Sequence, residues 1–130
     1  MATFLLDTTV IIDAINGKKN RNRSLIGLAE QGHMLACCPV NVAEVYAGLR
    51  PKEEARTAAL LQSLQLYPLT FPVAELAGRL KNNYARKGKA ISIADAMIAA
   101  VALHFRLTLI TDNTKDFPME ALAIHTLPEL

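Results

Sequence analysis

The sequence predicts an α/β fold in which helices cover both faces of a central five-stranded parallel sheet, a three-layer α/β/α sandwich. Short apolar runs alternate with amphipathic segments of helical spacing along the whole chain, as parallel sheets require. The hydrophobic content of 52% is enough for a full core, and 130 residues is the size of one domain. We therefore expect a single domain, 1–130, without internal repeats or linkers.

The first predicted strand is the apolar run Phe4–Leu6, which ends at Asp7. Two threonines follow Asp7 and suit a turn and a helix N-cap. Val10–Ile15 then predicts a short helix that stops at an Asn-Gly pair. After a polar, basic loop, Ser24–Gln31 has the apolar spacing of a second helix, and a glycine follows it.

The middle of the chain predicts two more strands and two helices. His33–Cys38 is a second apolar run that ends at a proline, which suits a strand terminus. Asn41 and Glu44 have the spacing of a capping box and predict the start of a helix. Lys52–Leu64 predicts another helix, and Leu66–Leu69 a third strand, whose internal proline is tolerated best at a sheet edge.

The rest of the chain predicts two helices and two strands. Val73–Arg86 has helical spacing and is preceded by a proline, which favours the first helical position. Ser92 opens a second capping box, and Ile93–Phe105 behind it is the most apolar helix, expected to be buried on most sides. Leu107–Ile110 predicts the fourth strand and Leu122–Thr126 the fifth.

Composition and charge indicate a cytoplasmic protein without a membrane segment. No uncharged window approaches the length of a membrane span, and the first residues lack a basic n-region. The adjacent cysteines Cys37 and Cys38 lie in an apolar run, so we expect buried thiols. The net charge is only +2, but two basic clusters offer either phosphate contacts or solvated surface. These clusters are Lys18, Lys19, Arg21 and Arg23, and Arg79, Lys81, Arg86, Lys87 and Lys89.

Acidic residues follow several predicted strands or begin the helices behind them. Asp7 ends the first strand, Glu44 and Asp95 lie in the first turns of their helices, and the loop 112–116 follows the fourth strand. In a parallel sheet with right-handed crossovers these positions share one rim. Each acid alone is also explained by helix capping or loop formation. Together, they would repel one another unless a cation lay between them.

Carboxylate oxygens without a nearby His or Cys favour Mg²⁺ or Mn²⁺ over Zn²⁺. Such a site is typical of metal-dependent phosphodiesterases, in which a metal-bound water attacks the phosphorus. Thr8, Thr9 and Thr111 are candidates to orient a carboxylate or the hydrated metal, and Asn113 is a candidate neutral ligand.

Four short motifs follow one another along the chain: Leu5–Asp13, Asn41–Leu49, Ile93–Ala100 and Leu109–Phe117. In this order they resemble the PIN-domain ribonucleases, specifically the VapC-type toxins of bacterial and archaeal toxin–antitoxin pairs. The resemblance covers nearly the whole chain.

The resemblance implies that Asp7, Glu44 and Asp95 hold the metal. Thr9 corresponds to the small polar residue that commonly supports the first acid. Family members place a fourth acid where this chain has either Asn113 or Asp116, and the charged Asp116 is favoured.

Asp112 departs from the family pattern, because many relatives have Arg at this position. Its carboxylate is expected either to join the rim or to point into solvent.

The family further implies Mg²⁺- or Mn²⁺-dependent RNA cleavage, a homodimer, and a cognate antitoxin that inserts a segment into the active-site groove. A PIN scaffold that binds RNA or a protein without cutting is the main alternative, although the three principal acids are present. A structure-specific DNA nuclease is disfavoured because the chain has no duplex-binding insertion. A phosphoacceptor domain would need an Asp after the third strand, where Leu69-Thr70 stands, and a Lys after the fifth, where Thr126-Leu127 stands. Dinucleotide binding lacks its glycine-rich turn.

Overall fold

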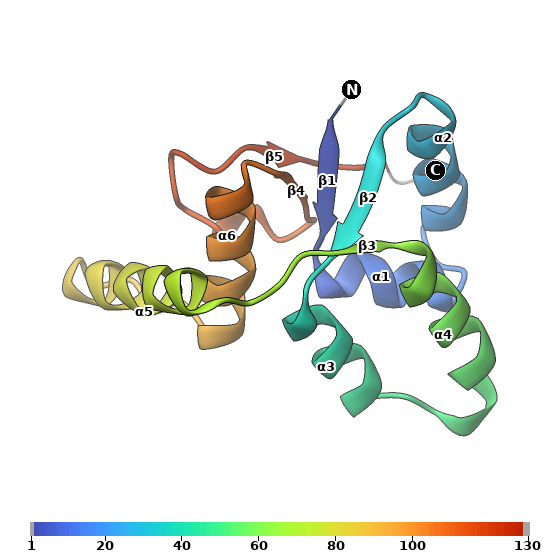
Figure 1. Ribbon diagram of the computed structural model, residues 1–130, viewed down its shortest axis with the longest axis horizontal. Coiled ribbons are helices and arrows are strands. Elements are labelled where there is room, and N and C mark those ends of the chain that lie inside the picture. Colours follow the sequence, from blue (N-terminus) through green and yellow to red (C-terminus); the bar gives the residue numbers. More distant parts are fainter. Residues whose placement is uncertain (1, 129–130) are drawn as a thin grey trace.

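The computed structural model describes residues 2–128 and contains one five-stranded, fully parallel sheet with strand order β3-β2-β1-β4-β5 (Figure 1). The strands are β1 Thr3–Leu6, β2 Met34–Cys37, β3 Gln65–Leu66, β4 Thr108–Ile110 and β5 Ile124–His125. The α-helices are α1 Thr8–Ile15, α2 Arg21–Glu30, α3 Pro39–Ala47, α4 Glu54–Ser63, α5 Phe71–Arg86 and α6 Ile93–Phe105. Two 3₁₀ turns, Pro51–Glu53 and Thr114–Asp116, precede α4 and follow β4. The predicted α/β architecture is confirmed.

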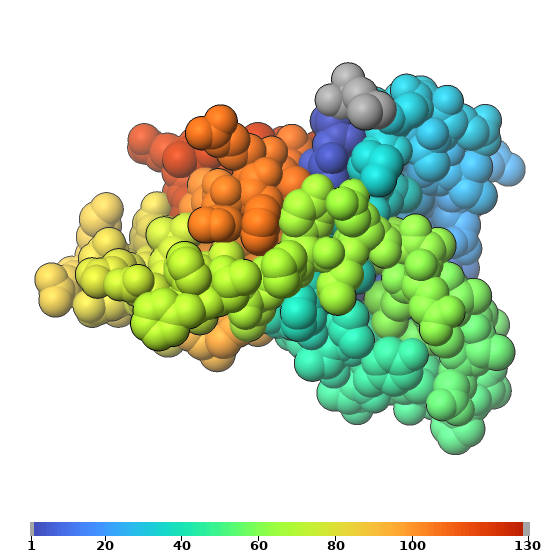
Figure 2. Space-filling view, in the orientation of Figure 1, coloured from blue at the N-terminus to red at the C-terminus, as the bar shows by residue number. Residues whose placement is uncertain are grey.

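Each face of the sheet carries its own apolar layer, because side chains alternate along a strand. Leu5 belongs to a buried cluster formed with α5 and α6, which includes Val73 and Val101. Its neighbour Leu6 belongs to the opposite cluster, which includes Val10 of α1 and Leu25 of α2. Helix α5 extends from one side of the molecule, and α3 and α4 extend from the other (Figure 2).

The two cysteines lie on opposite sides of this layered arrangement. Cys37 packs in the layer of α1, α2 and α4, whereas Cys38 packs in the layer of α5 and α6. Both are free buried thiols, as predicted. Burial raises the pKa of Cys37 to about 11, and burial also raises the pKa of Cys38.

Several predicted elements have the predicted bounds or position. Helix α6 covers Ile93–Phe105 as predicted, and six of its residues are buried. Strand β3 lies at the sheet edge as predicted, although it is only two residues long. The longest helix, α5, has 16 residues, and no helix within the described residues has the length and apolarity needed to cross a membrane.

Five helix starts differ from the prediction, including α4, which begins at Glu54 and not Lys52, and α5, which begins at Phe71 and not Val73. Asp7 itself caps α1 with its side chain, so neither threonine is the N-cap. Helix α2 begins at Arg21, three residues before the predicted start. Helix α3 begins at Pro39, whose fixed φ suits the first helical position, so the predicted Asn41–Glu44 capping box is wrong.

Candidate active site

The predicted acids gather beside the central strand β1, where the strand order switches from one side of the sheet to the other. β1 lies in the middle of the sheet, with β2 on one side and β4 on the other. Open α/β sheets bind ligands outside the carboxyl ends of the strands at such a switch point. Asp7 follows β1 there, and its backbone N–H donates to the Ile110 carbonyl of β4.

Asp7 is a buried carboxylate held by two donors. Its Oδ1 accepts from the Thr8 backbone N–H at 2.8 Å, and its Oδ2 accepts from the Thr111 hydroxyl at 2.7 Å. Burial raises the pKa of Asp7, and the charges of Asp95 and Glu44 raise it further, while the two hydrogen bonds partly oppose this shift. The site therefore gathers negative charge around Asp7.

Glu44 lies in the second turn of α3 and is exposed. It accepts a hydrogen bond of 2.6 Å from the Thr8 hydroxyl, which in turn accepts from the Asn41 amide at 3.0 Å. Asn41 is fully buried and also accepts from the Cys38 backbone N–H, so it ties the start of α3 to this chain of contacts. Sequence reasoning assigned Asn41 to a helix cap and missed this link. Pro39 signals that α3 begins before Asn41, but no sequence signal points to the contact with Thr8.

Asp95 lies in the first turn of α6, where its backbone N–H donates to the Ser92 side chain as predicted. Burial raises the pKa of Asp95, and the charges of Asp116 and Glu44 raise it further. Asp116 is exposed in the 3₁₀ turn after β4. Asp95 thus interacts electrostatically with Asp7, Glu44 and Asp116, and we call these four residues the acidic rim.

The supporting residues named from the sequence fall into different places. Thr111 is buried and holds Asp7, and its oxygen also accepts from the Asn113 backbone N–H at 3.0 Å. The side chain of Asn113 is exposed. Thr9 is exposed, and it is the neighbouring Thr8 that contacts both Asp7 and Glu44.

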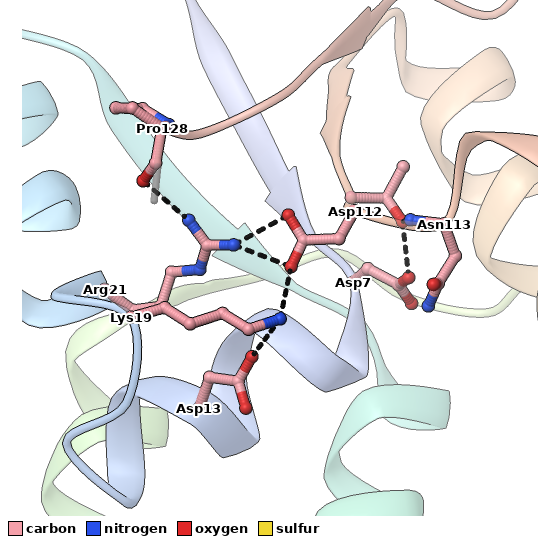
Figure 3. A network of polar contacts seen from close by, with 8 residues as sticks. Asp7, Asp13, Lys19, Arg21, Asp112, Asn113 and Pro128 are labelled. Carbon is pink, nitrogen blue, oxygen red and sulfur yellow. Dashed lines mark hydrogen bonds and ion pairs between the residues drawn. The ribbon is translucent and has the colours of Figure 1, made fainter. Parts of the chain in front are cut away.

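Asp112 neither joins the acidic rim nor points into solvent, which corrects the expectation. Arg21 Nη2 donates to both of its carboxylate oxygens, at 2.7 and 2.6 Å, and Lys19 Nζ lies 3.6 Å away (Figure 3). Arg21 is fully buried, so the prediction that it belongs to an exposed basic cluster is wrong for this residue. The departure from the family pattern singled out Asp112, but nothing in the sequence pointed to Arg21 as its partner.

The chemistry of the rim fits a hard divalent cation. Its four candidate ligands are all carboxylates, and the pKa values of Asp7 and Asp95 are raised partly by neighbouring acids. Within residues 2–128, no three Asp, Glu, His or Cys side chains are arranged to hold one ion between them. Mg²⁺ is commonly bound by one or two carboxylates with waters completing its coordination, and this rim fits that mode.

Comparison with known proteins identifies the family. The family model of the PIN domain matches residues 4–119, so the chain belongs to the PIN-domain family. Among curated proteins, Ribonuclease VapC19 of Mycobacterium tuberculosis is 30% identical over 115 residues, 88% of this chain and 92% of the relative. Ribonuclease VapC10 of the same species is 33% identical over 88% of this chain and 86% of its own length. Within the family, the chain is therefore of the VapC type, as its resemblance implied.

Solved structures agree with this fold. VapBC2 from Rickettsia felis, bound to a DNA fragment from its promoter, matches with a TM-score of 0.85 at 22% identity and covers 95% of this chain and 98% of its own. FitAcB from Neisseria gonorrhoeae matches with a TM-score of 0.74 at 27% identity, covering 93% and 95%.

Proposed function

We propose that this protein is an endoribonuclease and the toxin of a toxin–antitoxin pair, and that it hydrolyses RNA phosphodiester bonds with Mg²⁺ or Mn²⁺ held at the acidic rim. The single observation that carries the proposal is that four separate elements bring Asp7, Glu44, Asp95 and Asp116 together at one rim of the sheet, where Thr8 bonds to both Asp7 and Glu44. The pKa of Asp7 responds to Asp95 and Glu44, and that of Asp95 to Asp116 and Glu44. Neighbouring carboxylates repel one another unless a cation lies between them. This gathering of acids therefore favours a bound metal ion.

The proposed roles follow from the contacts. Asp7 is the most firmly positioned ligand, because both of its oxygens accept hydrogen bonds. The Thr8 hydroxyl fixes one oxygen of Glu44, and Asp95 and Asp116 add negative charge to the rim. When bound, a divalent cation would activate a water for attack on phosphorus and stabilise the departing oxygen.

The proposed partners are RNA, a cognate antitoxin and a second copy of this chain in a homodimer. RNA as substrate is supported by the names of the relatives, which include a tRNA(fMet)-specific endonuclease VapC of Shigella flexneri, 26% identical over 90% of this chain. An antitoxin is supported by similar structures described as VapBC and toxin–antitoxin complexes, one from Klebsiella pneumoniae at 26% identity. We expect the protein to act in the cytoplasm, consistent with its two free thiols.

The test is cleavage of a mixed small-RNA pool by the purified protein, with Mg²⁺, with Mn²⁺ and with chelator. Asp95→Asn, purified identically, controls for contaminating nucleases. We expect cutting that requires the metal and disappears in the variant.

The alternative is a PIN scaffold that binds RNA or a protein without cutting. It is favoured by one observation, that no three potential ligands in residues 2–128 are arranged around one ion. Equal silence of the wild type and Asp95→Asn with either metal, in the absence of a copurifying inhibitor, would support this alternative and reject the nuclease.

A further inference from the structure

We propose that the buried Arg21 and the half-buried Asp112 form a positioning pair, which fixes the loop after β4 so that the Thr111 hydroxyl holds Asp7 in its metal-binding orientation. This inference rests on the proposed function, because it assigns these residues a part in building the metal site. Neither residue touches the proposed metal or substrate, so both are positioning residues.

Arg21 is the first residue of α2 and brings a fully buried guanidinium to the sheet from a helix far away in sequence. Nη2 donates to both Asp112 oxygens, and Nη1 donates to the Pro128 carbonyl at 3.2 Å. Its Nε has no hydrogen-bond partner within residues 2–128. A buried cation that is incompletely hydrogen-bonded depends strongly on its carboxylate partner, so Asp112 is held tightly.

The loop after β4 is fixed from two sides by consecutive residues. Asp112 turns toward Arg21 (Figure 3), whereas Thr111 before it donates to Asp7 Oδ2 at 2.7 Å. The Asn113 backbone N–H closes the turn by donating to the Thr111 oxygen. Rotation of this loop would therefore break the contact with Arg21 and the contact with Asp7 together.

A second set of contacts extends the pair to α1. Lys19 Nζ lies 3.6 Å from Asp112 Oδ2 and 3.8 Å from Asp13 Oδ2. Asp13 belongs to the helix that Asp7 caps. The loop after β4 and helix α1, which meet at Asp7, are thus both connected to the segment that carries Lys19 and Arg21. Residues that orient metal ligands in this way typically change metal affinity by about 10–100-fold when removed.

The experiment measures the Mn²⁺ dissociation constant by titration calorimetry on the full chain in four forms: wild type, Thr111→Val, Asp112→Asn and the double variant. We expect each single change to weaken Mn²⁺ binding about tenfold. The double variant should be no weaker than the weaker single variant, because Asp112 acts through Thr111. A purely structural role for Asp112 would instead make the two effects multiply, and that result would overturn the proposal.

Glu53→Gln is the matched control, because it breaks another carboxylate–arginine pair, in which a buried Glu53 bonds to the exposed Arg50 in the turn before α4. It should leave Mn²⁺ binding unchanged. If Asp112→Asn fails to fold, Arg21→Met combined with Asp112→Leu replaces the ion pair by apolar side chains, which folds often tolerate. Wild-type Mn²⁺ affinity in that folded variant would also reject the positioning role.

A second readout does not depend on metal. Hydrogen exchange of the Asn113 amide in the metal-free protein should be faster in Asp112→Asn than in wild type or Glu53→Gln, because its acceptor Thr111 is released. If the wild type binds no Mn²⁺, the proposed function fails. The exchange of Asn113 then still decides whether the pair fixes the loop, and unchanged exchange would refute it.

Discussion

Asp7 and Glu53 are equally buried, at 5% exposure each, yet the fold treats them in opposite ways. Glu53 accepts hydrogen bonds from the Arg50 guanidinium and backbone N–H, and these contacts hold the pKa of Glu53 below its ordinary range. Asp7 has no ion pair within residues 2–128, and burial raises its pKa. The negative charge of Glu53 is thus compensated by an arginine within the fold, whereas the charge of Asp7 is not.

This difference separates structure from function. A compensated carboxylate stabilises the element that holds it, as Glu53 does where α4 follows α3. An uncompensated one lowers stability in the absence of a ligand, and folds retain such residues chiefly at functional sites. Four predictions test this contrast.

The largest effect is expected from exchanging each carboxylate for its amide. Asp7→Asn should lower RNA cleavage by more than about 100-fold, the upper end for a residue that only supports a ligand. The metal-free variant should unfold at equal or higher urea concentration, because Asn also caps a helix and relieves the repulsion. Glu53→Gln should keep the wild-type rate of RNA cleavage but unfold at a lower urea concentration. Loss of cleavage in both variants would remove the contrast.

The second prediction concerns metal-induced stabilisation. Mg²⁺ or Mn²⁺ at one hundred times its dissociation constant should stabilise the wild type by roughly 2.7 kcal/mol, since it binds the folded state. Thermal unfolding with and without the metal measures this effect. Asp7→Asn should show little of the shift, whereas Glu53→Gln should show all of it. An equal shift in Asp7→Asn would mean that the ion binds elsewhere.

The third prediction compares two neighbouring threonines. Thr8→Val removes the hydroxyl that donates to Glu44 and accepts from Asn41, so cleavage should fall about tenfold. Thr9→Val changes an exposed side chain and should leave cleavage within twofold, as roughly expected for surface positions. The rates of both variants on one RNA decide between them. A larger loss in Thr9→Val would restore the supporting role that the family resemblance assigned to Thr9.

The smallest effect is a difference in pH dependence. The pKa of Asp7 is raised above its ordinary value of 3.8, so its ionisation destabilises the metal-free protein as pH rises through the raised pKa. The stability gained by Asp7→Asn should therefore grow with rising pH. The pKa of Glu53 is lowered from 4.5, so its stabilisation is present above that value and lost as pH falls.

The stability lost in Glu53→Gln should accordingly shrink with falling pH. Urea unfolding of both variants and wild type across the acid range tests the two slopes. Slopes of the same sign would contradict the assigned shifts.

The order of strands and helices could be predicted from the sequence because local signals agree with the fold. Ser92 and the apolar run behind it define α6, and the proline after Leu66 marks an edge strand. Helix α3 was misplaced because two capping signals compete there, and Pro39 prevails over the Asn41 box.

The acids of the rim could also be predicted, because strand ends and helix starts converge in any parallel sheet. The partner of Asp112 could not be predicted, because Arg21 comes from a distant helix and belongs to a basic stretch of sequence that resembles a surface segment. Likewise, only the three-dimensional contacts distinguish Thr8 from Thr9. Contacts between distant elements leave no local pattern.

The adjacent cysteines pack in the two different apolar layers of the core, so each can report on local opening of its own layer. Cys37 and Cys38 are neighbours in sequence, but each is buried in a different helical layer of the sheet. Because the thiolate is the reactive species and burial disfavours it, an alkylating reagent must await such opening. The labelling rate of each cysteine would therefore measure how often the helical layer around it opens locally.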